Sequence, residues 1–570
     1  MKKIIKFISF FISLCIFATC VTACGGTTEK VDTSKSQLYI GNYNTGYGTA
    51  WINALKARFE EDYKDYSFEE GKKGIQVFID ETVSGVDIAS TLPGSRSEIF
   101  FTESVDYYNL YNLGLLKNID KWVTADLTEY GENKSIEDKM DENSIEYFKT
   151  ANGYYGLPFH ATCHNIAYDR DLFDEYNLYF AADTSEETYP AAYTESNGKK
   201  IYKFINSNQL VKSAGVDGKI GTYDDGLPAT FEQFFYLCDR LVANGIIPIT
   251  WAGQYQLYFT ELLMSLYANL EGVEQANLLY NFSGTADDIV TSIAGDGTVS
   301  TKSLEITEEN AYELMQQKGR YDALDFADRL ISNSDYYDAT KCFSKAQTHK
   351  DAQNTFLLGR FSDNVERTAM LIDGVYWINE ASGTFSSMEM KYGEQASASS
   401  RKIGFMPLPF ASDDQIGQKY TFTDNLYGAC FVNANVSDSR MNIIGEFLKY
   451  CHSNESLINF TQVTSAIKPF DYDIDANSEE YQNLTYYAQN LIEVINSSDI
   501  FYGKSNNVLF LDNISALRTV NGAIWNSTTN GMLYATPSTA INDGISGVDY
   551  FNGLANTFTK TYWEKSILRK

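Results

Sequence analysis

The residues best suited to contact a small molecule lie in a short glycine-rich segment near the start of the chain, YNTGYG. Tyrosine offers a flat aromatic face for stacking, and asparagine both donates and accepts hydrogen bonds. Gly46 and Gly48 allow the backbone to bend or to approach a ligand closely. We therefore predict that Tyr43, Asn44 and Tyr47 contact a ligand. The alternative is that they are ordinary solvent-exposed loop residues.

A second candidate group lies in the acidic segment VDGKIGTYDDG at 216–226. Its carboxylates, Asp217, Asp224 and Asp225, are hard oxygen ligands of the kind that calcium prefers. The spacing departs from an EF-hand loop, because Lys219 takes the third position and no closing glutamate follows. Two interpretations stay open: a structural calcium site, or an acidic turn without a metal ion. No other cofactor is predicted.

Motifs for catalysis are missing from the sequence. It contains no G-x-S-x-G, no H-E-x-x-H and no P-loop. His160, His164, His349 and His452 are isolated from one another along the chain. With 75 acidic residues, a carboxylate pair of the glycosidase type is compatible with the sequence, but only Glu103 can be named for it. We therefore predict a protein that is not an enzyme.

Strands and helices alternate in the region that must position the first candidates. Leu38 and Ile40 alternate in one strand, and Ile52, Leu55 and Phe59 form one helical stripe directly after the glycine-rich segment. Two more strands follow, in the segments GIQVFID and EIFFT. This alternation predicts an α/β fold with a parallel sheet, in which ligands bind beyond the carboxyl ends of the strands.

Polar side chains follow the EIFFT strand at this edge of the sheet. They are Thr102, Glu103 and Ser104, and Glu103 is the strongest candidate for a polar ligand contact. The alternative is that the threonine or the serine caps a helix that begins near Val105.

The N-terminus is typical of a secretion signal that ends at a lipidation site. Lys2, Lys3 and Lys6 precede an apolar run at 7–21, which is shorter than the ~20 residues of a membrane span. The run ends in VTAC and resembles the bacterial lipobox, whose cysteine is lipidated after cleavage just before it. A lipidated Cys24 would hold the protein on the outer face of the cell membrane. The alternative is an ordinary signal peptide with a chance cysteine.

Charge and cysteine usage narrow the range of partners. The formal net charge is −30, which argues against binding to nucleic acid or to anionic lipid. No later apolar run reaches the length of a membrane span, so the lipid would be the only anchor. The cysteines after the signal are odd in number and lack metal-ligand spacing, so we predict small core residues without disulfides: Cys163, Cys238, Cys342, Cys430 and Cys451.

Eight segments together resemble one known family. They are the lipobox and, in chain order, GTAWINALKARFEEDY, EIFFTESVDYYNLYNLGLLKNID, GYYGLPFHATCHNIAYDRDLFDEYNL, LPATFEQFFYLCDRLVANGIIPI, RTAMLIDGVYW, IGFMPLP and GEFLKYCHSNESLINFTQ. This set resembles the family 1 extracellular solute-binding proteins of carbohydrate ABC importers, the maltose-binding-protein type. The resemblance covers most of the chain, apart from two segments that look like insertions, at 180–226 and 281–309.

The resemblance implies a two-lobed fold of the periplasmic-binding-protein type. Each lobe would be a mostly parallel sheet flanked by helices, and the ligand cleft would lie at the hinge between the lobes. The implied organisation is a signal peptide at 1–23, the lipidated cysteine and a linker at 24–36, lobe 1 at 37–157 and 424–475, and lobe 2 at 158–423 and 476–570.

The resemblance also implies ligand contacts from both lobes. In the family, the position of Thr102 to Ser104 contacts the sugar, and a Gly-x-Trp motif supplies a stacking tryptophan. Here Tyr376 takes the place of that tryptophan and Trp377 follows it. On a regular strand only one of the two would face the cleft. The other candidates are Trp251, Gln254 and Tyr255 in lobe 2, and Asn425 and Tyr427 at the return crossover.

These expectations describe a monomeric, membrane-anchored binding protein. It would capture a carbohydrate, with an oligosaccharide as the preferred class, by hinge closure and deliver it to an ABC permease. Two alternatives stay open: a surface glycoside hydrolase or lyase, and a sensory receptor with the same binding fold.

Overall fold

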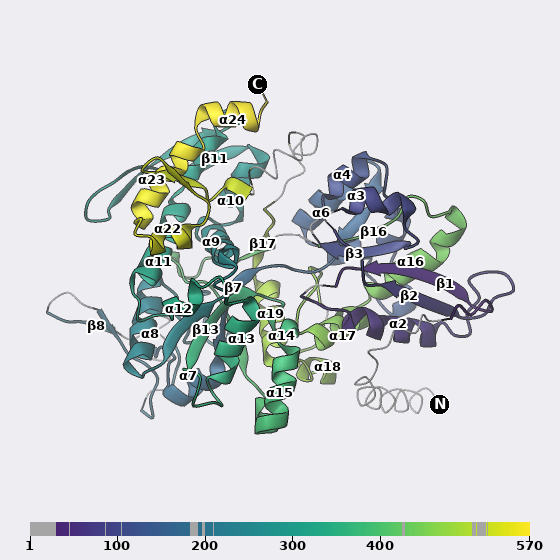
Figure 1. Cartoon of the computed structure of the whole chain (residues 1–570), viewed down its shortest axis with the longest axis horizontal. Coiled ribbons are helices and arrows are strands. Elements are labelled where there is room, and N and C mark those ends of the chain that lie inside the picture. The colour runs from purple at the N-terminus through teal and green to yellow at the C-terminus, as the bar shows by residue number, and fades with distance from the viewer. Residues whose placement is uncertain are drawn as a thin grey trace.

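The computed structural model describes residues 30–44, 46–85, 87–103, 105–182, 192–196, 200–208, 210–424, 428–472, 474–503, 509, 520 and 522–569. These residues fold into two lobes that lie side by side, each built on a β-sheet flanked by helices (Figure 1). The predicted two-lobed α/β architecture is therefore confirmed. The signal region at 1–29 lies outside the described residues, with the predicted lipidation site Cys24, and so do three predicted ligand contacts, Ser104, Asn425 and Tyr427.

Lobe 1 is built on a five-stranded sheet. Its strands are β1 (Ser36–Asn42), β2 (Ile75–Asp80), β3 (Ile99–Glu103), β6 (Gly156–Pro158) and β16 (Gly428–Val432). Their order among the described residues is β2-β1-β3-β16-β6. β1 pairs in parallel with β2 and β3, whereas β16 pairs antiparallel with β3 and β6. The sheet is mixed because β16 alone runs against the other strands.

Apolar patterning fixes the glycine-rich loop at the edge of this sheet. Leu38 and Ile40 have no exposed surface, as their alternation in β1 predicts. The buried stripe of α2 (Ala50–Asp62) contains the predicted Ile52, Leu55 and Phe59, and also Trp51. Each such side chain contributes about 1.5–3 kcal/mol when it is buried. The other helices of lobe 1 are α3 (Ile88–Thr91), α4 (Tyr107–Asn112), α5 (Asp120–Val123), α6 (Glu142–Phe148), α16 (Met441–Cys451) and α17 (Asn454–Thr464).

Lobe 2 is built on a four-stranded sheet. Its strands are β7 (His164–Asp169), β10 (Ile247–Trp251), β13 (Thr368–Gly374) and β14 (Ile403–Met406). Their order among the described residues is β10-β13-β7-β14, with β7 antiparallel to both of its neighbours. Every residue of β7 and β13 is buried, as expected for central strands that are covered on both faces.

Helices surround the sheet of lobe 2. A capping threonine begins α8 (Phe231–Ala243): Gln233 N donates to Thr230 Oγ1 (3.4 Å), and Ala229 N donates to Gln233 Oε1 (2.8 Å). The other helices are α7 (Arg170–Tyr176), α9 (Gln256–Glu271), α10 (Val273–Asn281), α11 (Lys318–Ser332), α12 (Ala339–Cys342), α13 (His349–Leu358), α14 (Trp377–Glu380), α15 (Ser382–Tyr392), α19 (Tyr486–Ser497), α22 (Pro537–Asn542), α23 (Gly547–Thr557) and α24 (Lys560–Ser566).

Short hairpins occupy the two segments that look like insertions. One contains β8 (Ala192–Thr194) and β9 (Lys200–Tyr202), and the other contains β11 (Gly284–Ile293) and β12 (Val299–Ile306). Figure 1 shows both hairpins at the periphery of lobe 2. Three further strand pairs are β4 (Lys149–Thr150) with β5 (Gly153–Tyr154), β15 (Thr421–Thr423) with β17 (Asp499–Phe501), and β18 (Ser527–Thr529) with β19 (Met532–Tyr534).

The chain passes between the lobes at three places. The first crossover, residues 159–163, joins β6 of lobe 1 to β7 of lobe 2. The second joins β15 to β16, and the third leads from α17 through α18 (Glu479–Gln482) to α19. Thr162 N donates to Asp424 Oδ1 (3.0 Å) and Ala161 N to Ile467 O (3.2 Å), so the first crossover is hydrogen-bonded to each of the other two.

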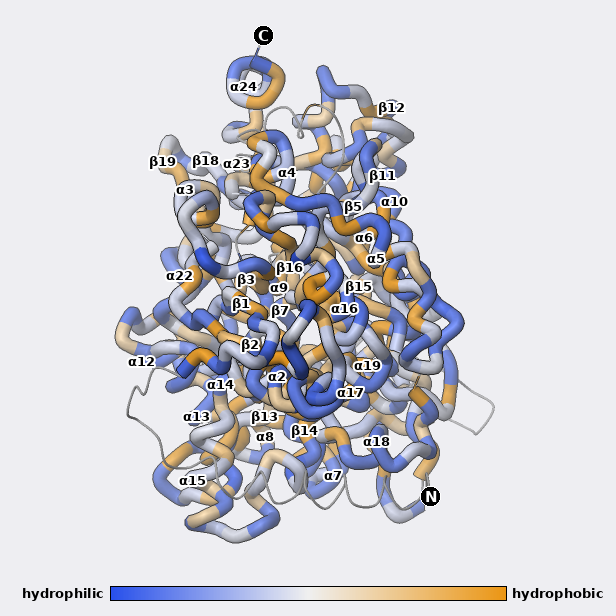
Figure 2. Tube along the Cα trace, turned by 90° about the vertical axis from the view of Figure 1, so that its right-hand side faces the viewer, coloured by the Kyte–Doolittle hydropathy of each residue, from blue (hydrophilic) through white to orange (hydrophobic). Residues whose placement is uncertain are grey.

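The interior agrees with the expectation for the cysteines. All five cysteines after the signal region are free and buried, as predicted. Apolar stretches of the tube gather along the central strands of lobe 1, with polar loops around them (Figure 2). Within the described part of the chain, no helix combines the length and the apolar character that a membrane crossing requires.

Candidate ligand site between the lobes

The glycine-rich loop of lobe 1 holds Tyr47 against the first crossover. Tyr47 is 2% exposed, and its hydroxyl donates a hydrogen bond to Ala161 O (2.7 Å). Its ring centroid lies 4.2 Å from that of His160 and 5.6 Å from that of Tyr376 in lobe 2. Burial and the charge of nearby Glu103 raise the pKa of Tyr47 well above its usual value, so the hydroxyl stays a hydrogen-bond donor.

Two histidine–carboxylate pairs hold the ends of the first crossover. His160 Nε2 lies 3.1 Å from Glu103 Oε1 at the end of β3, and His164 Nδ1 contacts Glu261 Oε2 on α9. Burial alone would lower the pKa of His164, but Glu261 and other nearby carboxylates outweigh it, so that pKa is raised. Glu103 and His160 were both named from the sequence, but their pairing was not predicted. The sequence analysis also missed Glu261, because no spacing rule links a residue of α9 to a histidine of β7.

Tyr376 of lobe 2 reaches the glycine-rich loop of lobe 1. Its ring lies between two glycines: a Cβ on Gly46 would stand 2.7 Å from Tyr376 Cδ2, and a Cβ on Gly374 would stand 2.4 Å from Tyr376 Cζ. Asn379 Nδ2 donates to Gly46 O (2.6 Å), and Tyr376 Oη lies 3.4 Å from His164 Nε2. The lobes therefore touch directly here, and a ligand can enter this contact only when they move apart.

We call this group the crossover cluster, after the segments that it surrounds. Its members come from both lobes and from the first crossover: Tyr47, Glu103, His160, His164, Glu261 and Tyr376.

The expectation that Tyr376 and Trp377 share a regular strand is wrong. β13 ends at Gly374, and Trp377 is the first residue of α14. The chain can turn here because Gly374 has no Cβ, which allows the Tyr376 ring to fold back over it. The two rings nevertheless diverge: Tyr376 is half-buried at the lobe contact, whereas Trp377 is fully buried among aromatic rings of lobe 2.

Two other predicted contacts are enclosed by their own lobes. Trp251 is 1% exposed, and its ring packs 4.9 Å from that of Tyr337 in lobe 2. Thr102 has no exposed surface and lies beside Gly85, where a Cβ would stand 1.6 Å from Glu103 O. Because both side chains are buried, any role in ligand binding requires a rearrangement of the surrounding lobe.

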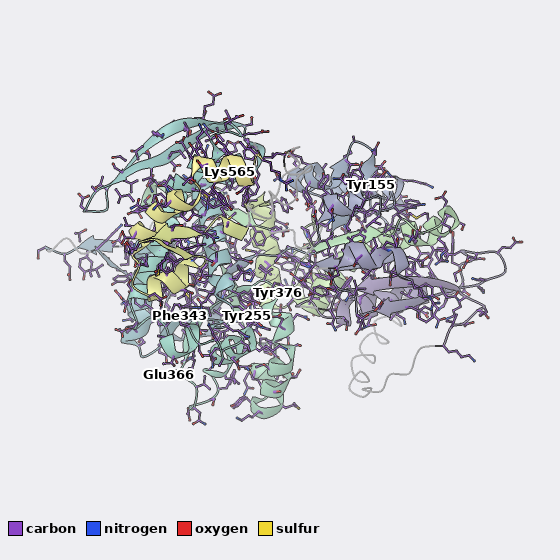
Figure 3. All side chains as sticks on the ribbon, turned by 45° about the horizontal axis from the view of Figure 1, so that its top comes forward. Tyr155, Tyr255, Phe343, Glu366, Tyr376 and Lys565 are labelled. Atoms are coloured by element: carbon purple, nitrogen blue, oxygen red, sulfur yellow. The ribbon has the colours of Figure 1, made fainter. Side chains whose placement is uncertain are left out.

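Tyr255 forms an exposed edge next to the crossover cluster. It is 40% exposed and stacks on Tyr258, whose ring centroid lies 4.5 Å from that of His164. Figure 3 shows Tyr255 and Tyr376 close together where the lobes meet. Tyr258 was missed by the sequence analysis, although it lies one helical turn from the named Tyr255. The remaining candidates lie at the surface: half-buried Tyr43, and exposed Asn44 and Gln254.

The carboxyl groups of Asp373 and Glu380, near Tyr376 in lobe 2, both accept hydrogen bonds from the side-chain amide of Gln353. Gln353 Nε2 donates to Asp373 Oδ2 and to Glu380 Oε2, both at 3.0 Å. Burial, together with the charge of Glu380, raises the pKa of Asp373 to about 7, and burial also raises the pKa of Glu380. His349 Nε2 lies 3.8 Å from Glu380 Oε1. These groups make the lobe 2 side of the contact acidic and rich in hydrogen-bond acceptors.

A cavity of about 410 Å³ lies beside the crossovers. We call it the crossover cavity. It is lined from both lobes, by Lys139, Met140, Asp141, Phe422, Asp424, Pro469, Phe470, Asp471, Ile495, Asn496, Ser498, Ile500 and Tyr502. Tyr502 contacts Asp141 Oδ2 through its hydroxyl, and Asn143 Nδ2 donates to Ile500 O (3.0 Å), so lobe 2 is also tied to α6 of lobe 1. The volume of the crossover cavity is within the range of small-molecule sites.

The three aspartates at 216–226 accept hydrogen bonds from their own loop. Asp224 has no exposed surface, and it accepts from Asp217 N (3.1 Å) and Thr222 Oγ1 (2.8 Å). Asp225 accepts from Gly221 N (2.8 Å), and Asp217 accepts from Lys219 N (2.8 Å). In the described part of the chain, no group of three or more acidic, histidine or cysteine side chains is arranged to hold a metal ion. Calcium binding stays a prediction.

Solved structures with the same architecture identify the fold. The first is a protein from work on xylan utilization by Caldanaerobius polysaccharolyticus, with 12% sequence identity over 92% of this chain and 100% of that chain, at a TM-score of 0.53. The apo form of RafE from Streptococcus pneumoniae shares 12% identity over 93% and 100% of the two chains, at a TM-score of 0.50. This chain has the fold of a two-lobed solute-binding protein.

A third solved structure also shares the fold. It is a probable secreted solute-binding lipoprotein from Streptomyces coelicolor, with 13% identity over 92% of this chain and 99% of that chain, at a TM-score of 0.50. No family model and no curated protein sequence matches the chain. At these identities the solute-binding fold is shared, whereas the ligand contacts must be argued from this chain's own residues.

Proposed function

We propose that this chain is a solute-binding lipoprotein that captures a carbohydrate between its lobes. The observation that carries the proposal is the convergence of side chains from both lobes on the crossovers. Tyr47 and Glu103 come from lobe 1, and Tyr255, Tyr258 and Tyr376 come from lobe 2. A pyranose has apolar C–H faces and a rim of hydroxyls, so it needs aromatic faces and directional hydrogen-bonding groups together.

Capture by this site would use opening and closing about the crossovers. The direct contact of Tyr376 and Asn379 with Gly46 closes the region in the structure. A ligand that inserts there replaces this contact with its own contacts to both lobes. Such a ligand stabilises the closed state only by the difference between its affinities for the closed and open states. A membrane permease that distinguishes the two states can then accept loaded protein selectively.

The proposed partners follow from this mechanism and from the N-terminal signal. Delivery of the carbohydrate would go to an ABC permease, and a lipid on Cys24 would keep the protein at the outer face of the membrane. The description of the Streptomyces coelicolor structure as a solute-binding lipoprotein supports the anchor, and the xylan work supports a carbohydrate ligand. A monomer suffices for the proposed capture, because both halves of the site come from one chain.

The proposal is tested by incubating the purified protein with a panel of oligosaccharides. Binding is measured by calorimetry, and the recovered sugar is analysed for cleavage products. We expect at least one oligosaccharide to bind at one molecule per chain and to be recovered intact. Recovery of shortened or unsaturated products would show a hydrolase or lyase instead. If the whole panel fails to bind, the carbohydrate proposal is wrong.

A further inference from the structure

A second cavity, of about 480 Å³, lies in lobe 2 away from the crossovers. It is enclosed by the end of β7 and the start of α7, by the loop at 216–226, and by α19. His164 of the crossover cluster begins β7, and this cavity lies beyond its other end, so about 17 Å of extended chain separates the two. The cavity is therefore not part of the proposed carbohydrate site. We call it the α7–α19 cavity.

Two cations line this cavity, each over the face of a tyrosine. The guanidinium carbon of Arg170 lies 4.5 Å from the ring centroid of Tyr486, and Lys212 Nζ lies 3.2 Å from that of Tyr179. Among the described residues, neither cationic group forms a salt bridge or a side-chain hydrogen bond.

The carboxylates of the cavity wall accept hydrogen bonds from groups other than the two cations. Asp225 accepts from the backbone of its own loop, at Gly221 N (2.8 Å), and Glu493 Oε1 accepts from Tyr481 Oη (3.2 Å). Burial, followed by the charge of Arg170, lowers the pKa of Lys212 to about 8. The fold thus holds two like charges near each other, partly withdrawn from water. Asp174 and Asp225 offset the charge of Lys212 only in part, and among the described residues neither forms an ion pair with it. An anion between the two cations would remove this cost.

Hydrogen-bonding side chains complete the wall on α19. Gln489, Asn490 and Glu493 follow Tyr486 at helical spacing and line the same cavity. Asn490 Oδ1 accepts from Phe405 N (2.6 Å), while its Nδ2 has no partner among the described residues. Amide and carboxylate groups of this kind suit the hydroxyls of a sugar-sized molecule, and the volume of the cavity is in the range of small-ligand sites.

We propose that the α7–α19 cavity is a second binding site, which takes a sugar-sized molecule carrying one anionic group, with Arg170 and Lys212 on the anion. The anionic group is a phosphate or a carboxylate, since both are planar or compact oxygen anions that a guanidinium and an ammonium recognise. The site is independent of the interlobe site, so one chain would bind two different ligands.

Calorimetric titration of the purified protein tests this site. The probes are D-glucose 6-phosphate for the phosphate arm, D-glucuronate for the carboxylate arm, and uncharged D-glucose. We expect one or both anions to bind and D-glucose not to bind. Arg170→Gln and Lys212→Met should each weaken anion binding at least tenfold. Lys402→Met removes an exposed lysine of the same lobe outside the cavity wall, and it should leave binding unchanged.

The outcomes separate the possibilities. Binding of only one anion supports the site and identifies its anionic group. The proposal is overturned if neither anion binds the parent at millimolar concentration, or if both bind equally well to Arg170→Gln and Lys212→Met. Circular dichroism and melting curves show whether each variant is folded, and the two variants lie on different elements, so one misfolded variant leaves the other to decide. Failure of the oligosaccharide panel would not affect this result.

Discussion

At the scale of single residues, Tyr376 and Trp377 provide a matched pair. Tyr376 touches lobe 1, whereas Trp377 is fully buried inside lobe 2. We expect Tyr376→Ala to weaken oligosaccharide binding at least tenfold, as aromatic hot spots usually do. Trp377→Ala should instead lower the free energy of unfolding by ~3–5 kcal/mol. Calorimetry and denaturant unfolding on both variants measure the two effects.

Phe470→Ala is the control that shows whether the ligand occupies the crossover cluster or the crossover cavity. Phe470 lines the crossover cavity rather than the crossover cluster, and it is 3% exposed. If Phe470→Ala weakens binding and Tyr376→Ala does not, the ligand occupies the crossover cavity and the assignment to the cluster is wrong.

Asp373 gives a prediction about pH. Its pKa is raised to about 7, so between its ordinary value near 4 and pH 7 the folded protein holds a proton that the unfolded chain releases. The contribution of Asp373 to the free energy of unfolding therefore falls as the pH rises from about 4 to about 7. The difference in unfolding free energy between Asp373→Asn and the parent should therefore shift in favour of the variant by about 2 kcal/mol from pH 5 to pH 8. Denaturant curves at the two pH values measure it, and an equal difference at both would contradict the raised pKa.

The sequence could predict some residues of the cluster but not their pairing. Tyr47, Glu103 and Tyr376 were named from loop position and family resemblance, and the structure brings them together; that they bind ligand stays a prediction. His164 and Glu261 lie in separate elements, and only the packing of α9 against β7 joins them. The burial of Trp251 likewise depends on neighbours such as Tyr337, which local sequence does not reveal.

At the scale of elements, the acidic loop at 216–226 distinguishes a metal site from a hydrogen-bonded turn. Asp224 is buried and accepts from Asp217 N and Thr222 Oγ1. We expect Asp224→Ala to lower the free energy of unfolding by about 1–3 kcal/mol, because two donors lose a buried acceptor. If the loop is a hydrogen-bonded turn without a metal ion, the melting temperature of the parent does not respond to a calcium chelator. A chelator-induced fall that Asp224→Ala abolishes would establish the calcium site instead.

Element boundaries were predictable where apolar periodicity alone decides them. The stripe of α2 and the alternation of β1 are local patterns, and both are found in the structure. The end of β13 was not predictable in this way. There the glycine at 374 and the ring of Tyr376 produce a turn that depends on close approach rather than on periodicity. The direction of β16 was also missed, since pairing with β3 and β6 is a long-range property.

At the scale of the whole molecule, the two-lobed fold followed from the order of segments along the chain. The attachment of that molecule to a membrane rests on Cys24, outside the described residues. We expect Cys24→Ala to remove lipidation and to shift the protein from the membrane fraction to the medium or to an unprocessed precursor. Fractionation of cells with mass analysis of the N-terminus checks this. An N-terminus still modified on a membrane-bound variant would show that the lipobox interpretation is wrong.

Capture between the lobes is the central claim, and a crystal structure with the tightest-binding oligosaccharide tests it most directly. The claim predicts sugar density at the crossover cluster, with Tyr376 of lobe 2 and Tyr47 or Glu103 of lobe 1 in contact with the same molecule. Gly46 and Tyr376 should then be separated by ligand instead of touching. Density confined to the surface of one lobe, with the contact between Gly46 and Tyr376 intact, would contradict it.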